Sequence, residues 1–274
     1  MSKKELENTT QLTAQLVIFP EGDVYKKQAE ELSRKLETKI VTELPVEESG
    51  ILALHLSNDG ISLVGNGQTL QCDLSHMLSR AKPNNLNGEL LVKTAKIKGV
   101  EGTLTAIDAT AGFGEDAFLL AAVGFRVKLY EKDTVIAALL QDALRRSKLK
   151  PELAEITNRM ELMEEDSLVA LPQLTEEADV ILLDPMFPAR QKSGLIKKKF
   201  QLLQQLERPC SDEEELLNAA ISNHPRKVVI KRPLKGAYLA GRKPDYSIKG
   251  KAIRYDCIVI PRHMALPNVA EETK

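Results

Sequence analysis

The sequence has little that would support an exported, membrane-spanning or metal-dependent protein. Its three cysteines, Cys72, Cys210 and Cys257, are far apart and form no CxxC pair, so neither disulfides nor a zinc site are expected. The four histidines are scattered without ligand spacing, and we therefore expect no catalytic metal. No apolar run approaches the roughly 20 residues of a membrane-spanning helix, and the start "MSKKELENTTQ" has no apolar signal core. These absences favour a reducing cytoplasm and no membrane association.

The composition is that of an ordinary globular chain, with 43% hydrophobic and 28% charged residues among 274. The first part predicts a small α+β unit, with a strand in "QLTAQLVIF", a helix in "DVYKKQAEELSRKLE" and a hairpin in "ILALHLSNDGISLVG" that turns at Asp59-Gly60. A Pro/Asn/Gly-rich joint, "AKPNNLNG", and a short helix, "ELLVKTAKI", follow. We therefore predict an N-terminal domain over residues 1–80 and a second domain over residues 81–274.

Beyond residue 100, apolar strands alternate with helical stretches. The expected strands are "TLTAIDAT", "RVKLYEKD", "MELMEED", "ADVILLDP", "RKVVIKRP" and a late "IRYDCIVIP". This alternation predicts an α/β, Rossmann-like parallel sheet with helices on both faces, closed by a late hairpin strand. Ligands of such sheets bind at the carboxyl ends of the strands, so the residues that follow each strand are the candidate site.

The first of these strand ends, "DATAGFGEDAF", places Asp108, Gly112 and Gly114 before a helix. The stretch from Gly112 to Ala117 fits the GxGxxA pattern of dinucleotide-binding proteins. However, Glu115 and Asp116 would repel a pyrophosphate at the helix start. The spacing from Asp108 to the glycines is instead that of enzymes that bind S-adenosylmethionine, whose sulfonium is cationic. A glycine turn that only packs the helix on the strand is a third interpretation.

The next two strand ends also carry acids. Glu131 in "LYEKD" is placed to hold ribose hydroxyls, and Asp166 with Ser167 in "EEDSL" could accept a hydrogen bond from an adenine amine. Each acid is weak evidence alone, but their succession favours S-adenosylmethionine as the cofactor.

The turn "DPMFP" at the fourth strand end is similar to the motif of methyltransferases that act on exocyclic amines. Such an amine is a poor nucleophile because its lone pair is drawn into the base. Asp184 and the Pro185 carbonyl are expected to accept its N–H groups, and Phe187 is expected to stack on the base. The alternative is ordinary Asp-Pro turn chemistry after a strand.

A basic segment follows, with sixteen Lys/Arg against six Asp/Glu between Ala189 and Arg254. It predicts a surface for a polyanion beside the DPMFP turn, although solvation alone remains the alternative for each residue. A helix in this segment is expected to bury Leu195, Ile196, Phe200, Leu203 and Leu206. The residues assigned to RNA binding are Lys192, Lys197, Lys198, Lys199, Lys231, Arg232, Lys235, Arg242, Lys243, Lys249, Lys251 and Arg254.

Several motifs together resemble the RsmJ-type small-subunit ribosomal RNA (guanine-N2)-methyltransferases. They are "DATAGFGEDAF", "EKDTVIAALLQDAL", "DPMFPARQKSGLIKKKFQLLQ", "VVIKRP" and "KGKAIRYD", and they lie between about Arg80 and Pro261. The resemblance implies S-adenosylmethionine-dependent methylation of a guanine N2 in 16S rRNA, with ribosomal RNA or a ribosomal particle as partner and no obligate protein partner. It implies cofactor contacts at Glu115, Asp116, Glu131, Lys132, Asp166, Ser167 and Asp184.

The family often has Arg at the positions of Glu115 and Lys132, and Ser at that of Asp166. Two alternatives stay open from the sequence. One is an NAD-dependent oxidoreductase, which would use the GxGxxA stretch. The other is a non-catalytic rRNA-binding assembly factor, in which the sheet is only a scaffold.

Overall fold

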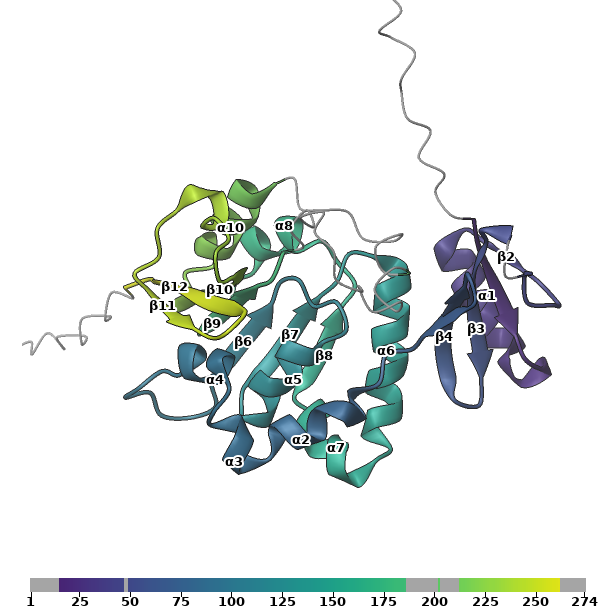
Figure 1. The fold of residues 1–274 in the computed structure, drawn as a ribbon, viewed down its shortest axis with the longest axis horizontal. Helices are drawn as coiled ribbons and strands as arrows, with labels where there is room; N and C mark the ends of the chain where they lie inside the picture. Colours follow the sequence, from purple (N-terminus) through teal and green to yellow (C-terminus); the bar gives the residue numbers. More distant parts are fainter. Residues whose placement is uncertain (1–14, 47–48, 186–201, 203–211, 262–274) are drawn as a thin grey trace, which may run out of the picture.

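The computed structural model describes residues 15–46, 49–185, 202 and 212–261, which form two sheets (Figure 1). Within these ranges no helix has both the length and the apolar character needed to cross a membrane.

The N-terminal sheet has five strands in the order β2-β1-β3-β4-β5. They are β1 (Leu16–Pro20), β2 (Lys39–Ile40), β3 (Leu52–Ser57), β4 (Gly60–Gly65) and β5 (Gln68–Leu70). A 3-10 turn (Asp23–Tyr25) and α1 (Lys26–Leu36) follow β1, which pairs in parallel with β2 and β3. The predicted helix and hairpin are confirmed, and Gly60 adopts a φ of 108° at the hairpin turn.

Four short helical segments link this sheet to the next one. They are η3 (Leu74–Met77), α2 (Leu78–Ala81), α3 (Pro83–Leu86) and α4 (Leu90–Ala95). The boundary predicted at residue 80 falls inside α2 and stays a prediction. Lys227 donates hydrogen bonds to the carbonyls of Thr94 (3.0 Å) and Lys96 (2.7 Å), so a lysine of the second sheet caps the end of α4.

The second sheet has seven strands in the order β11-β12-β10-β9-β6-β7-β8. They are β6 (Thr105–Asp108), β7 (Arg126–Tyr130), β8 (Met160–Met163), β9 (Val180–Leu183), β10 (Lys227–Pro233), β11 (Tyr246–Lys249) and β12 (Ile253–Val259). β6 to β10 are parallel to one another, β12 pairs antiparallel with β10, and β11 pairs antiparallel with β12. The predicted Rossmann-like sheet with its late hairpin is confirmed.

Helices cover both faces of this sheet (Figure 1). They are α5 (Glu115–Ala122), α6 (Thr134–Lys148), α7 (Pro151–Thr157), α8 (Ser167–Ala170), η4 (Leu171–Gln173) and α10 (Glu213–Ser222), with η5 (Leu239–Gly241) in a later loop. Val180 and Leu182 of β9 share one core with α5 and α6, whereas Ile181 and Leu183 share the other with α10. Because successive side chains of β9 point to opposite faces of the sheet, β9 contributes to an apolar core on each face.

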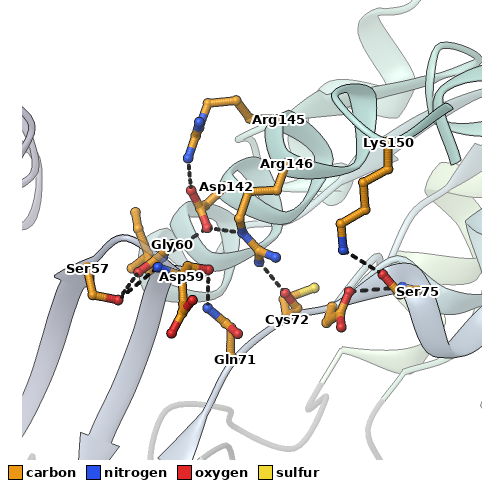
Figure 2. A network of polar contacts seen from close by, with 12 residues as sticks. Ser57, Asp59, Gly60, Gln71, Cys72, Ser75, Asp142, Arg145, Arg146 and Lys150 are labelled. Carbon is orange, nitrogen blue, oxygen red and sulfur yellow. Dashed lines mark hydrogen bonds and ion pairs between the residues drawn. The ribbon is translucent and has the colours of Figure 1, made fainter.

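The N-terminal sheet is joined to the second sheet through α6 (Figure 2). The buried carboxylate of Asp142 accepts hydrogen bonds from the Ile61 N–H (2.9 Å), Arg145 (2.8 Å) and Arg146 (2.7 Å). Arg146 also donates to the carbonyl of Cys72. Leu202 is buried beside Gly65 of β4. The apolar stripe predicted around Leu202 lies outside the described residues.

Candidate active site

The turn after β6 begins at a buried carboxyl. Asp108 is 2% exposed and accepts a hydrogen bond from the Thr110 N–H (3.2 Å). Burial raises the pKa of Asp108 to about 8, and the nearby Asp116 adds to this effect. Gly112 and Gly114 have φ angles of 53° and 71°, so the turn requires the glycines that the sequence places there.

Glu131 holds this glycine turn from the end of β7. Its two carboxylate oxygens accept the N–H groups of Gly112 (2.9 Å) and Asp133 (2.8 Å). Burial raises the pKa of Glu131. A carboxylate offers about four acceptor positions, so Glu131 can still accept from ribose hydroxyls.

The end of β8 is tied to its neighbours as well. Lys132 lies 3.6 Å from the Asp166 carboxylate, and Asp166 caps α8 by accepting the Leu168 N–H (3.0 Å). The Ser167 hydroxyl donates to the Ala109 carbonyl (2.7 Å). Ser167 is therefore engaged with the backbone of the first turn.

A lysine joins two of the predicted acids. Lys231 of β10 places its Nζ 2.8 Å from Asp116 Oδ2 and 2.9 Å from Asp184 Oδ2. We call Asp108, Asp116, Asp184 and Lys231 the acid–lysine cluster. Burial opposes the charge of Lys231, but attraction to Asp116 and Asp184 raises its pKa. From the sequence, Lys231 was predicted only to bind RNA; the structure places it inside the candidate site.

Asp184 is the member of this cluster that belongs to the DPMFP turn. Its backbone N–H donates to Thr110 Oγ1 (2.7 Å), which fixes the start of the turn against the end of β6. Burial raises the pKa of Asp184, while Lys231 lowers it. Pro185 is buried. Phe187, Lys192, Lys197, Lys198 and Lys199 lie outside the described residues.

Glu115 is directed differently from the other acids. Its Oε1 lies 3.1 Å from His76 Nε2 of η3, whereas Asp116, the next residue on α5, faces Lys231. No group of three or more His, Cys, Asp or Glu side chains suited to a metal ion occurs in the described part of the chain.

Two of the predicted phosphate contacts are wrong. Arg232 and Arg254 are each 4% exposed, and their guanidinium groups are already bonded. Arg232 donates to the Ala237 carbonyl (2.8 Å), and Arg254 pairs with Asp256 (2.9 Å). The exposed members of the predicted set near the described site are Lys235, Arg242, Lys243, Lys249 and Lys251.

Comparison with known proteins shows the family. Residues 37–260 match a family model described as "Putative SAM-dependent methyltransferase". The chain is 39% identical over 239 residues to ribosomal RNA small subunit methyltransferase J of Alkalilimnicola ehrlichii, covering 82% of this chain and 88% of the relative. This chain belongs to the ribosomal RNA small subunit methyltransferase J family. The relative of that name from Aeromonas hydrophila is 41% identical over 66% of this chain and 73% of its own.

A solved member of the wider group supports the fold of this methyltransferase J relative. The crystal structure of an S-adenosylmethionine-dependent methyltransferase from Neisseria gonorrhoeae superposes with a TM-score of 0.70 and 27% identity, covering 90% of this chain and 96% of that one. The chain is thus an S-adenosylmethionine-dependent methyltransferase, and the relatives described above support neither the oxidoreductase nor the non-catalytic alternative.

The site of this family member fits its cofactor. The carboxylates of Asp116 and Asp184 suit a ligand with a sulfonium and an ammonium group, whereas Asp108, with its pKa raised to about 8, is mostly protonated at neutral pH. A side chain built on Gly112 would enter open space, so the backbone there can be approached closely. We keep Asp108, Gly112, Gly114, Asp116, Glu131 and Asp184 as proposed cofactor contacts. Glu115, Lys132, Asp166 and Ser167 remain predictions.

Proposed function

We propose that this enzyme transfers the methyl group of S-adenosylmethionine to the exocyclic N2 amine of a guanine in 16S rRNA. The observation that carries the proposal is the position of Asp184. It follows β9 and enters the acid–lysine cluster beside the glycine turn. The names of the curated relatives supply the substrate class, small-subunit ribosomal RNA.

The catalytic task of the chain is to make the amine nucleophilic and to align it. Asp184 and the Pro185 carbonyl would accept the two N–H groups, which localises the nitrogen lone pair. The cofactor supplies a methyl group already activated by its sulfonium. Pro185 fixes the backbone of the turn, so the acceptors need little reorganisation. Stacking of the base on Phe187 remains a prediction.

Lys231 has a specific part in this scheme. Without a cation, repulsion from the nearby Asp116 would raise the pKa of Asp184 further. By pairing with both, Lys231 lowers the pKa of Asp184 and so favours the ionised form, which can accept hydrogen bonds from the amine. Lys231 acts through Asp184, so we describe it as a positioning residue.

The geometry of the base restricts the substrate. N2 of guanine projects into the minor groove, and a base inside a helix cannot align this amine with an enclosed methyl group. The target guanine is therefore unpaired, loop-borne or flipped out of the stack. The partner is small-subunit rRNA or a ribosomal particle, and the enzyme works in the cytoplasm where these are assembled. No obligate protein partner is needed for this chemistry.

The decisive experiment uses small-subunit particles that lack the modification. Incubation with labelled S-adenosylmethionine should label one guanine at N2, identified by nucleoside analysis and mapping. Asp184→Asn should lower the rate by about 10²- to 10⁴-fold, the size of a general-base contribution. Asp245→Asn is the matched control, because Asp245 is exposed, precedes β11 and lies outside the acid–lysine cluster. Parent-like turnover of folded Asp184→Asn would disprove the proposed role.

A further inference from the structure

The loop between β10 and β11 is held in shape by buried arginines. Nη1 of Arg254 donates to the carbonyls of Pro233 (2.8 Å), Leu234 (2.9 Å) and Gly236 (3.0 Å). Arg232 donates to the next carbonyl, that of Ala237 (2.8 Å). Four carbonyls, at the end of β10 and in the loop, therefore accept hydrogen bonds from buried guanidinium groups, which makes the loop an ordered surface.

The far half of the loop is anchored as well. Glu213, in the first turn of α10, accepts the Ala240 N–H (2.9 Å) and lies 3.4 Å from Arg232. Leu239 is buried, at 1% exposure. The acids Glu213 and Asp256 balance the two arginine charges. The loop therefore needs no ligand to neutralise its interior.

Tyr238 stands at the centre of this loop and faces outward. Its side chain is 40% exposed, and its ring lies over the Arg254 guanidinium, whose Cζ is 5.1 Å from the ring centroid. The neighbouring Leu239 is packed in the core, which fixes the position of the Tyr238 backbone at the surface. No role was predicted for Tyr238 from the sequence.

The surroundings of Tyr238 select an anionic, aromatic ligand. Lys235, Arg242 and Lys243 are exposed, belong to the same loop and form no ion pair with any other described side chain. Lys249 and Lys251 lie at the turn between β11 and β12, beside the start of β12 where Arg254 is found. The loop also follows directly on Lys231 and Arg232, at the carboxyl edge of the sheet that carries the candidate site.

We propose that Tyr238 is a stacking platform for an unpaired base of the RNA substrate, with Lys235 and Arg242 contacting the neighbouring phosphates. Aromatic side chains stack on any base, whereas flanking cations follow the backbone. The stacked base is a neighbour of the target guanine, because the target must reach Asp184. The inference rests on the proposed rRNA substrate and adds the position at which the strand is held.

The chain provides a matched control in Tyr246. Tyr246 is 38% exposed and also has a cation near its ring, Lys227 Nζ at 5.7 Å from the centroid. Its hydroxyl, however, lies 3.0 Å from that Nζ and 3.4 Å from the Thr94 carbonyl, at the part of the sheet where Lys227 caps α4. Tyr246 is thus similar in exposure but engaged in a structural contact.

The test uses the absence of tryptophan from the natural chain. Tyr238→Trp and Tyr246→Trp each create a single fluorophore, and titration with a single-stranded oligoadenylate reports stacking as quenching. We expect quenching of Tyr238→Trp only. We also expect Tyr238→Ala to weaken oligonucleotide binding roughly 5- to 100-fold, with Tyr238→Phe close to the parent and S-adenosylmethionine affinity unchanged.

The outcomes separate this inference from the proposed function. Equal oligonucleotide affinity of Tyr238→Ala and the parent, or equal quenching in both tryptophan variants, overturns the platform even if the parent methylates rRNA. A parent that binds oligonucleotide through Tyr238 but methylates no small-subunit RNA overturns the proposed function and leaves the platform supported. A parent that neither binds nor methylates RNA overturns both.

Discussion

Replacement of Lys231 by Met tests the electrostatic design of the site. The substitution keeps an unbranched side chain but removes the cation that lies 2.8 Å from Asp116 and 2.9 Å from Asp184. The acid–lysine cluster then contains three carboxyl groups and no positive charge. Burial already raises the pKa of Asp184, and the loss of Lys231 should raise it further.

The size of the change follows from the contact distances. An opposite charge within about 4–6 Å lowers a carboxyl pKa by roughly one to three units, so its removal should return a similar amount. The ionised form of Asp184 is the acceptor, and activity is therefore lost as pH falls through its pKa. In Lys231→Met the acidic limb of kcat/KM should move up by about one to three pH units. At pH values below the acidic limbs of both the parent and Lys231→Met, kcat/KM of the variant should be roughly 10- to 1,000-fold lower than that of the parent.

The assay is the pH profile of kcat/KM for methyl transfer to unmodified small-subunit particles. Lys231→Arg should restore most of the parent profile, because a guanidinium can pair with both carboxylates. Lys128→Met is a control for the same substitution in the sheet, since Lys128 is part-exposed on β7. A uniform loss of rate at all pH values, with an unmoved acidic limb, would refute the proposed effect on Asp184.

Three further predictions concern the cofactor turn, the buried acid and the contact with the N-terminal sheet. Glu131→Ala should weaken S-adenosylmethionine binding at least ~10-fold, about 1.4 kcal/mol, because it frees the Gly112 N–H; calorimetry that shows NADH binding instead would contradict the assignment. The folded-state pKa of Asp108, about 8, exceeds its ordinary 3.8, so between these pH values the folded protein retains a proton that the unfolded chain releases. The free energy of unfolding, measured by urea denaturation, should therefore fall as pH rises through this window, and it should fall less steeply in Asp108→Asn. The same pH dependence in the parent and in Asp108→Asn would count against this. Asp142→Ala should lower the free energy of unfolding by about 3 kcal/mol, because the buried Ile61 N–H and the part-buried Arg146 lose the carboxylate that accepts their hydrogen bonds. If the midpoint of urea denaturation did not change, the contact would be unimportant for stability.

The main strands were predictable because each is an apolar run that ends at a polar residue. β6, β7 and β9 follow this pattern, and the acids at their ends were predicted together with the strands. β11 was missed because Tyr246–Lys249 has only partly buried or exposed side chains, so its hydrogen bonds to β12 define it rather than an apolar pattern. β2 is two residues long and both are exposed, which leaves no periodicity to detect.

The role of Lys231 depended on strand order, which local sequence does not contain. β10 lies beside β9 in the sheet, and this neighbourhood brings Lys231 to Asp184. The count of basic residues treated Lys231, Arg232 and Arg254 as equivalent to surface lysines. Each of the three has a partner in another element, α5, α10 or the loop after β10, so only the tertiary structure separates buried cations from those available to RNA.

The structure also connects the segment that follows the N-terminal sheet to the cofactor turn, a relation for which the sequence offered no signal. Arg146 binds the Cys72 carbonyl, and the Cys72 thiol lies 3.6 Å from the carbonyl of Phe113, between the two glycines of the turn. Burial raises the pKa of Cys72 to about 12, so the thiol retains the proton that it donates. His76, four residues later, contacts Glu115 at the start of α5. The segment that leaves the N-terminal sheet therefore contacts the turn on both sides of Gly114, at the backbone that is proposed to receive the cofactor.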